Sequence, residues 1–409
     1  MAPFAPAAAR ALWHTVRVPA VASTAVAPPL LLGIETSCDD TACAVLDGSG
    51  RVLASVVSSQ LEVHREWGGV VPEIASREHL RNWPAVSDQA LRQAGIGLDR
   101  IDAVAATRGP GLVGALLVGL SIGRAIAWGR GIPFYGVHHL EAHLHSPWLV
   151  GGGEPAVEPP ERFVGLVVSG GHTLLVEAEE AGRRLHTVAE TRDDAMGEVF
   201  DKVGKRLGLP FPAGPAVDAL AERGDAGAQP MPIGSCGSSL DFSFSGLKSR
   251  ALLQIDKLGR DGVRVEVVGA DPAAVGRLRA ETAAASETGS ARVERDAGVA
   301  AIPAPEILDL LAAFRAAAVG QLLDRVARLH ASRPFSTLAV SGGVAANLLL
   351  RRELKGWAAR AEVDLRLVSI AFSGDNASMI AHAALLRHRR GEADDPRRVD
   401  AVSRIALEA

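Results

Sequence analysis

Cysteine and aromatic residues are scarce in this chain. Three cysteines, Cys38, Cys43 and Cys236, stand among 409 residues. They are too few and too scattered for a disulfide framework or a cysteine zinc site, and they suit a reducing compartment. Aromatic residues make up 4% of the chain, whereas glycine alone contributes 43 residues. The composition therefore predicts a core of small side chains in which helices approach strands closely.

The chain also lacks a strong net charge and an unbroken apolar segment. Its formal net charge is -4, so any contact with nucleic acid must use a local basic patch. The apolar stretches Ala20–Ile34 and Gly109–Ile122 are interrupted by Pro or Gly, and no run of about 18 residues has the flanks of a membrane span. We therefore expect no membrane partner. The length suits about two lobes with tails.

The first 29 residues contain no acidic residue. They carry Arg10, Arg17 and several hydroxyl residues, and the first acid of the chain is Glu35. An acid-free, alanine-rich leader with arginines is typical of a mitochondrial or chloroplast transit peptide; a disordered tail in an alanine-rich proteome is the alternative. We predict a mitochondrial transit peptide over residues 1–29, excluded from the fold, and a matrix location.

Two segments share a pattern of strand, small polar turn and strand. They are Leu30–Asp47 and Phe163–Glu177, and each is followed by alternating helical and strand-like segments. The repeat predicts a duplicated α/β architecture. We expect a first lobe over residues 30–150, a loop between lobes over 151–162, and a second lobe over 163–374. A surface insertion at about Asp256–Pro303 interrupts the second lobe, and residues 375–409 form a C-terminal helix and tail.

A pair of histidines, His139 and His143, is spaced four residues apart. On a helix this spacing places both imidazoles on one face, where they can reach one divalent ion. A bare H-x-x-x-H is more often a pair of incidental surface histidines, so a metal site needs a third ligand. Asp375, between a predicted strand and the last predicted helix, is a candidate, although an Asp at that position commonly caps the helix.

Two glycine-rich turns follow predicted buried strands, Ser169–Thr173 and Ser341–Val344. Paired glycines let the backbone approach a ligand and direct several N–H groups at one anion. No Lys-bearing phosphate loop is present. This arrangement fits the actin, sugar-kinase and chaperone-ATPase superfold, in which a nucleotide lies in the cleft between two duplicated lobes.

A set of separate motifs resembles one family. The motifs are Gly33–Thr41, Gly68–Glu73, Ala75–Arg77, His139–His143, Val168–Thr173, Asp193–Ala195, Phe200–Lys205, Asp241–Lys248, Ser341–Asn347 and Gly374–Ile380. In this order they resemble the tRNA threonylcarbamoyladenosine transferases, once called O-sialoglycoprotein endopeptidases, and with the leader most nearly the mitochondrial member. They span nearly all of the chain outside the leader and the insertion.

The resemblance implies the roles of particular residues. The metal ligands of the family fall on His139, His143 and Asp375, which would hold one divalent ion per subunit, iron or zinc. The last helix would then return to the cleft. The adenylate contacts fall on Val167, Val168, Ser169, Gly170, Gly171, Asp201, Gly214, Asp218 and Asn347. Where the family usually has Gly-Gly-Pro, this chain has Ala213-Gly214-Pro215, which makes a contact at the first position less secure.

The implied reaction is an acyl transfer to tRNA. A threonylcarbamoyl group would move from threonylcarbamoyl-AMP, made by a separate synthase, to the exocyclic amine of the adenosine 3′ of the anticodon in ANN-decoding tRNAs. In mitochondria this would serve tRNA modification and genome maintenance, and the mitochondrial relatives resemble homodimers. No catalytic side chain beyond the metal site is assigned. Glu35 and Asp39 are possible general bases, and Cys38 is interpreted as packing.

Two other functions compete with this one. A zincin-type metalloprotease needs H-E-x-x-H with its Glu beside the first ligand, whereas Glu141 here lies two residues after His139 and turns away from the metal face. An ATP-binding regulatory or chaperone module would place Mg²⁺ on carboxylates and phosphates rather than on paired histidines.

Local basic groups are candidates for tRNA contact. They are Lys202, Lys205, Arg206, Lys248, Arg250, Arg387, Arg389 and Arg390. Solvated helix faces and helix C-termini carry the same residues, so the sequence leaves both interpretations open.

Overall fold

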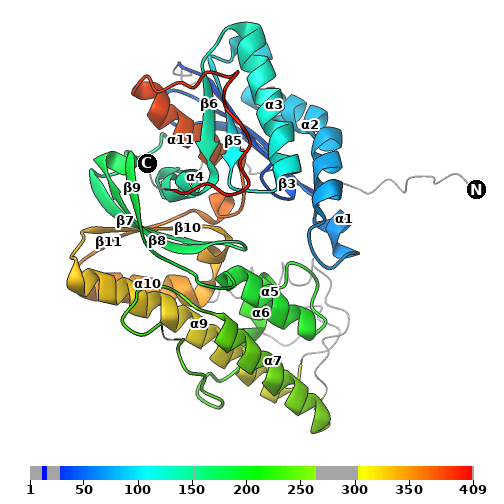
Figure 1. Cartoon of the computed structure of the whole chain (residues 1–409), viewed down its shortest axis with the longest axis vertical. Helices are drawn as coiled ribbons and strands as arrows, with labels where there is room; N and C mark the ends of the chain where they lie inside the picture. The colour runs from blue at the N-terminus through cyan, green and yellow to red at the C-terminus, as the bar shows by residue number, and fades with distance from the viewer. Residues whose placement is uncertain (1–11, 16–27, 152, 235, 264–302, 408–409) are drawn as a thin grey trace, which may run out of the picture. The chain divides into compact units, whose positions relative to one another are not determined.

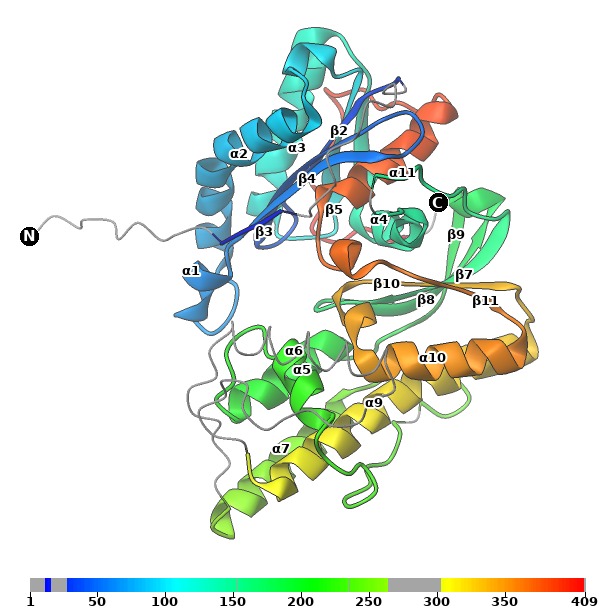
Figure 2. The same ribbon diagram turned by 180° about the vertical axis from the view of Figure 1, so that it is seen from behind.

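The computed structural model describes residues 12–15, 28–151, 153–234, 236–263 and 303–407. The chain divides into two compact units (Figures 1 and 2). The first unit comprises Met1–Pro159 and Ser369–Leu407, and the second comprises Pro160–Val368 with the last two residues. The C-terminal segment thus belongs to the same unit as the N-terminal half.

The first unit contains a six-stranded sheet in the order β1-β4-β3-β2-β5-β6. Its strands are β1 Leu12–Thr15, β2 Leu31–Glu35, β3 Asp40–Leu46, β4 Val52–Ser59, β5 Ala103–Gly109 and β6 Phe134–His138. Its α-helices are α1 Leu61–Arg65, α2 Pro72–Ala94, α3 Val113–Arg130, α4 His139–His145 and α11 Ala377–Arg389. Short 3-10 turns are η1 Leu98–Arg100, η2 Ser146–Trp148 and η5 Ile370–Phe372.

The second unit contains a five-stranded sheet in the order β11-β10-β7-β8-β9. Its strands are β7 Arg162–Val168, β8 Thr173–Glu179, β9 Arg184–Glu190, β10 Thr337–Ser341 and β11 Asp364–Leu367. Its α-helices are α5 Met196–Arg206, α6 Gly214–Ala221, α7 Ser245–Arg260, α9 Pro305–Ser332 and α10 Leu348–Ala361. The 3-10 turns are η3 Glu180–Gly182 and η4 Gly343–Ala346.

The two sheets have the same topology apart from β1. In each, three consecutive antiparallel strands are followed by two parallel strands beside the first of the three: β4-β3-β2 then β5 and β6, and β9-β8-β7 then β10 and β11. The two hairpins that the sequence predicts open these two sheets. The predicted duplication of an α/β unit is therefore confirmed.

Small residues let helices cover both faces of the first sheet. A Cβ at Gly33 would lie 2.3 Å from the Ala377 carbonyl oxygen of α11, and one at Gly119 of α3 would lie 3.2 Å from Ile34. Neighbouring strand residues point to opposite faces, so α11 covers the Gly33 face and α3 the Ile34 face. Figures 1 and 2 show these helices on either side of the sheet. The abundance of glycine that the sequence shows is used here for close packing.

Helix α3 is the one described helix long and apolar enough to cross a membrane by length and composition. It packs against α2 and β5 in the first unit. Its Gly123 faces the side chains of Ala106 and Phe134 of the sheet. These contacts are those of a helix in the core of a globular unit.

Several element boundaries differ from those expected. Residues Leu12–Thr15 of the leader, expected to lie outside the fold, form β1 and pair with β4. The predicted insertion cannot begin at Asp256, because Leu247, Ala251 and Ile255 continue one buried face and α7 extends to Arg260. The rest of the insertion, residues 264–302, lies outside the described residues.

Candidate metal centre and ligand pocket

Helix α4 presents the histidine pair. It begins directly after β6, and the His138 side chain accepts a hydrogen bond from the Leu140 N–H, which caps the helix. The other ring nitrogen of His138 lies 3.3 Å from the carbonyl oxygen of Ile405 in the C-terminal tail. The rings of His139 and His143 meet edge to face, with their centroids 4.7 Å apart. Both side chains are buried, so they are not incidental surface histidines.

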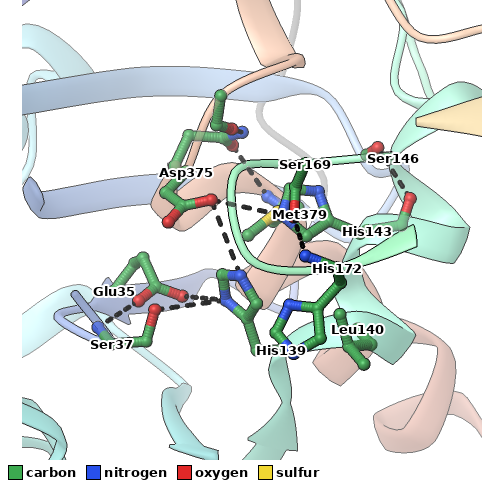
Figure 3. Close-up of polar contacts among 12 residues, drawn as sticks. Glu35, Ser37, His139, Leu140, His143, Ser146, Ser169, His172, Asp375 and Met379 are labelled. Atoms are coloured by element: carbon green, nitrogen blue, oxygen red, sulfur yellow. Dashed lines mark hydrogen bonds and ion pairs between the residues drawn. The ribbon is translucent and has the colours of Figure 1, made fainter. Parts of the chain in front are cut away.

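Asp375 reaches the same point from the far end of the chain (Figure 3). Its Oδ1 lies 3.2 Å from Nε2 of His143 and 3.6 Å from Nε2 of His139. Asn376, not Asp375, caps α11, because the Asn376 Oδ1 accepts a hydrogen bond from the Met379 N–H. Asp375 is therefore not the N-cap, and its carboxylate faces the two histidines.

The three side chains fit a divalent cation. Their ligand atoms all lie within 4.8 Å of one another, and ligands held about 2.0–2.2 Å from a tetrahedral ion lie roughly 3.3 Å apart. Burial lowers the pKa of His143, which favours the neutral imidazole that a metal requires. Burial alone would lower the pKa of His139, but Asp375 and Glu35 raise it to about 9. Two carboxylates therefore favour positive charge at this point.

Glu35 orients His139 from behind. Its Oε2 lies 3.1 Å from Nδ1 of His139 and accepts a hydrogen bond of 2.7 Å from the Thr107 hydroxyl. Its Oε1 accepts a hydrogen bond of 2.5 Å from the Ser37 N–H. Burial would raise the pKa of Glu35, but the charge of His139 and these hydrogen bonds hold it below its usual value. A carboxylate on Nδ1 fixes the ring so that Nε2 is the ligand. Glu35 is fully buried and both of its oxygens are engaged, an arrangement that favours positioning of His139 over the role of general base considered from the sequence.

The substitution Glu35→Gln tests this orientation. We expect metal affinity to fall by about 10–100-fold, the usual effect of losing such a partner, with transfer recovering at high metal concentration. Competition with a chelating dye measures the affinity. Glu141→Gln is the matched control, since Glu141 on the same helix interacts electrostatically with Arg387 and Arg390. Equal affinity in Glu35→Gln and the natural protein would contradict the role.

Two further reactive groups near this centre, Cys38 and Asp39, have raised pKa values. Burial raises the pKa of the Cys38 thiol, and neighbouring Asp39 raises it further. Burial likewise raises the pKa of Asp39. A thiol held neutral does not attack a carbonyl, which supports the interpretation of Cys38 as packing.

A second site lies wholly within the second unit. A pocket of about 210 Å³ is lined by residues from the turns after β7 and β10 and from α5 and α6: Gly170, Gly197, Phe200, Asp201, Pro212, Gly214, Pro215, Asp218, Gly343, Val344 and Asn347. Five predicted adenylate contacts, Gly170, Asp201, Gly214, Asp218 and Asn347, are among them. The other four do not line it: Val167 and Val168 are buried in β7, and Ser169 and Gly171 lie in the turn that follows.

Sequence reasoning missed six of the lining residues. Gly343 and Val344 belong to the glycine-rich turn Ser341–Val344, which the sequence already marks as suited to bind an anion. Gly197 and Phe200 precede Asp201 by four and one residues on α5, a spacing that places all three on one face. Pro212 and Pro215 flank the Ala213-Gly214 pair. These signals were present in the sequence.

The turn at Ala213 and Gly214 is held by Asp201. The Asp201 Oδ1 accepts hydrogen bonds from both backbone N–H groups, at 2.7 and 3.0 Å. The Ala213 side chain packs against Gly204 of α5. A Cβ added at Gly204 would lie 2.3 Å from the Ala213 Cβ. Packing therefore accommodates Ala213 in place of the first glycine of Gly-Gly-Pro, and the Ala213 N–H keeps its hydrogen bond to Asp201.

Asp218 and Asn347 are joined inside the protein. The Asn347 side chain donates to Asp218 Oδ1 at 2.7 Å and accepts from the Leu350 N–H as the cap of α10. Arg315 of α9 donates to the same Asp218 oxygen at 2.9 Å. The two residues thus form one rigid wall of the pocket, fixed by α6, α9 and α10.

Comparisons with known proteins agree with this picture. A family model described as tRNA N6-adenosine threonylcarbamoyltransferase matches residues 51–382. A protein of that name in Pelobacter propionicus is 45% identical over 354 residues, which cover 86% of this chain and 90% of the relative. Another in Caldicellulosiruptor saccharolyticus is 38% identical over 365 residues, which cover 89% of this chain and 94% of the relative. Among solved structures, HypF of T. kodakarensis is similar with a TM-score of 0.50 at 13% identity, covering 89% of this chain and 48% of that one.

The duplicated sheets and this similarity define an α/β protein of the actin-like ATPase and sugar-kinase fold. One of its units carries a three-ligand group suited to a metal. Within that class, the chain belongs to the tRNA N6-adenosine threonylcarbamoyltransferase family and is a transferase that modifies tRNA.

Proposed function

We propose that this protein transfers the threonylcarbamoyl group of threonylcarbamoyl-AMP to the exocyclic amine of the adenosine 3′ of the anticodon in ANN-decoding tRNAs. The family supports a tRNA substrate. The single observation that carries the proposal beyond the family is the convergence of His139, His143 and Asp375, because an incomplete set would remove the centre on which the reaction depends.

In the first unit, His139, His143 and Asp375 would hold one iron or zinc ion. Two imidazoles and a carboxylate suit either metal. When bound, the ion supplies Lewis acidity towards an acyl carbonyl or phosphate oxygen. Glu35 keeps Nε2 of His139 directed at the ligand position. The side chain of Asp375 is 27% exposed, so the centre is open to a substrate on that side.

In the second unit, the pocket would hold the adenylate part of the donor. Asp201 and the wall formed by Asp218 and Asn347 offer polar atoms for ribose hydroxyls, as acids do in other nucleotide sites. The backbone at Gly170 and Gly343 can approach the phosphate closely. In the transfer, the amine nitrogen forms a bond to the carbamoyl carbon, the bond from that carbon to the phosphate oxygen breaks, AMP leaves, and the amine loses a proton.

Reconstitution tests the function. Purified protein is mixed with an adenylate synthase, threonine, bicarbonate, ATP and an ANN-decoding tRNA, and the tRNA nucleosides are analysed by mass spectrometry. We expect the threonylcarbamoyl mass on adenosine. Its absence with metal-replete protein would overturn the proposal, and elemental analysis of protein purified without oxygen distinguishes iron from zinc.

The substitution Asp201→Asn tests the donor pocket. A hydrogen bond to a charged group contributes about 1.5–3 kcal/mol, so we expect the KM for the adenylate to rise by roughly 10–100-fold. The KM for tRNA should change little. Initial rates at varied donor concentration measure this, with Glu353→Gln on the surface of α10 as control. An unchanged KM for the donor would contradict the placement of the adenylate.

We further propose a mitochondrial matrix location and a homodimer. The acid-free leader with Arg10 and Arg17 supports the first, and the resemblance to mitochondrial relatives supports the second. Import of residues 1–29 fused to a fluorescent protein tests targeting, and light scattering tests the oligomer. Cleavage before Leu30 would remove β1, so sequencing the mature N-terminus shows whether β1 is part of the working enzyme.

A further inference from the structure

Two helices of the second unit carry an excess of basic residues. Helices α5 and α7 lie side by side (Figures 1 and 2). Together they contain Lys202, Lys205, Arg206, Lys248, Arg250, Lys257 and Arg260, against Glu198, Asp201 and Asp256. In a chain with a net charge of -4, this is a local reversal of sign.

Some of these cations hold the two helices together. Asp194 pairs with Lys202 of α5 at 2.6 Å and also with Lys248 of α7. Arg206 of α5 pairs with Asp256 of α7. These three cations have structural partners, so they do not by themselves indicate a ligand.

The remaining cations of α7 have no such partner. Arg250, Lys257 and Arg260 are exposed, and none forms an ion pair with any residue that the structure describes. Spacings of seven and three residues place them along one face of the helix. We call Arg250, Lys257 and Arg260 the basic stripe. A row of exposed cations that form no ion pair with a described acid attracts an anionic polymer.

A groove runs beside this stripe. Its volume is about 750 Å³, and it is lined by Arg250 and Lys257 together with Ile233 and Leu253. Ile233 is 50% and Leu253 67% exposed. The backbone of a nucleic acid alternates charged phosphates with less polar riboses, so it matches a groove lined by both basic and apolar side chains.

The stripe is connected to the donor pocket through α5. Gly197, Phe200 and Asp201 line the pocket, and Lys205 begins the exposed end of the same helix. Four residues span about 6 Å along a helix. A nucleic acid lying along α5 and α7 would therefore pass close to the proposed adenylate.

Three other basic residues that the sequence singled out, Arg387, Arg389 and Arg390, have partners in the first unit. Arg387 donates to the Gly136 carbonyl and pairs with Asp394, Arg389 pairs with Glu158, and Arg390 pairs with Glu392. These contacts consolidate the first unit. They leave the basic stripe as the better candidate; of its three residues, the sequence singled out only Arg250.

We propose that the basic stripe on α7 binds the phosphate backbone of the substrate tRNA and sets its register relative to the donor pocket. The inference rests on the tRNA substrate of the proposed function. It assigns to α7 the binding of RNA, not of an acidic protein or a second copy of the chain. The contact is to charge and not to base sequence, so it adds affinity without selecting a particular tRNA.

The double substitution Arg250→Glu with Lys257→Glu tests the inference. We expect the Kd for an ANN-decoding tRNA to rise at least about 30-fold near 0.1 M salt. The slope of log affinity against log salt should fall by about 1.4–1.8, because each of the two phosphate contacts contributes roughly 0.7–0.9. The KM for tRNA should rise in step, while kcat and the KM for the adenylate change less than about twofold.

Two controls separate a specific surface from a general loss of charge. Lys355→Glu with Arg360→Glu makes the same charge change on two exposed residues of α10, and we expect the Kd to change less than about threefold. Arg250→Lys with Lys257→Arg keeps both charges and should keep binding. All variants change exposed side chains, so their thermal unfolding should match the natural protein.

Four results would overturn the inference. The first is an unchanged Kd and salt slope in the double variant. The second is equal weakening by the α10 control, which would indicate only a diffuse field. The third is a changed molecular mass with normal tRNA affinity, which would assign the stripe to a protein interface. The fourth is no tRNA binding by the natural protein. Because binding is measured without turnover, failure of the reconstituted transfer alone would overturn the proposed function and leave this test intact.

Discussion

Replacing His143 with Ala is expected to remove the bound metal and to lower threonylcarbamoyl transfer by at least about 100-fold. His143 is fully buried and its Nε2 lies 3.2 Å from Asp375, so no solvent-exposed group can replace it without a change in the fold. Lewis-acid stabilisation is worth several kcal/mol, and each 1.36 kcal/mol is tenfold in rate. His139→Ala should behave in the same way.

Metal content by elemental analysis and transfer by nucleoside mass spectrometry measure the result. His186→Ala is the control, because His186 is an exposed histidine of β9 in the second unit, and it should keep both metal and activity. Treating the natural protein with a strong chelator should reproduce the loss, and adding metal should restore transfer. Full activity in metal-free His143→Ala protein would refute the assignment.

Replacing Gly33 with Ala is expected to destabilise the protein by about 3 kcal/mol, the upper end for overpacking a filled core. The added Cβ would lie 2.3 Å from the Ala377 carbonyl oxygen and 2.9 Å from the Ala381 Cβ. Backbone atoms cannot turn aside as a flexible side chain can, so α11 must move away from β2. Asp375 precedes that helix by two residues, and metal affinity should fall as well.

Urea unfolding and a metal titration measure these two effects. Gly129→Ala in α3 is the matched control, since nothing lies within 4 Å of its added Cβ. In a helix that change should stabilise by about 0.5–1 kcal/mol. Unchanged stability of Gly33→Ala would show that α11 is not held against β2 as the structure indicates.

The sequence predicted the repeated hairpins because two apolar runs on either side of a small polar turn form a pattern that depends only on neighbours in the chain. The same is true of His139 and His143, whose spacing fixes their common face once α4 forms. Predicting Asp375 required the family resemblance. Local sequence favoured a helix cap there, and only the structure shows that Asn376 takes that role.

Other features depend on contacts between distant segments. Glu35 binds His139 across 104 residues, and Arg315 binds Asp218 across 97 residues, and neither pair leaves a local pattern. The sequence did not predict the pairing of β1 with β4, because the composition of residues 1–29 indicated a targeting segment outside the fold. Of the predicted adenylate contacts, Val167 and Val168 lie at the end of β7, where they pair with β8.

The division of the chain has a consequence for its synthesis on the ribosome. Residues Pro160–Val368 form the second unit before Ser369–Leu407 complete the first. Until those last residues emerge, the Gly33 face of β2 lacks the helix that covers it, and His139 and His143 lack Asp375. The set of His139, His143 and Asp375, which could hold a metal, is therefore complete only once the C-terminal segment has been made. A chain that ends before Ser369 would lack both Asp375 and the helix α11 that covers β2, so we expect metal content to distinguish full-length from truncated product.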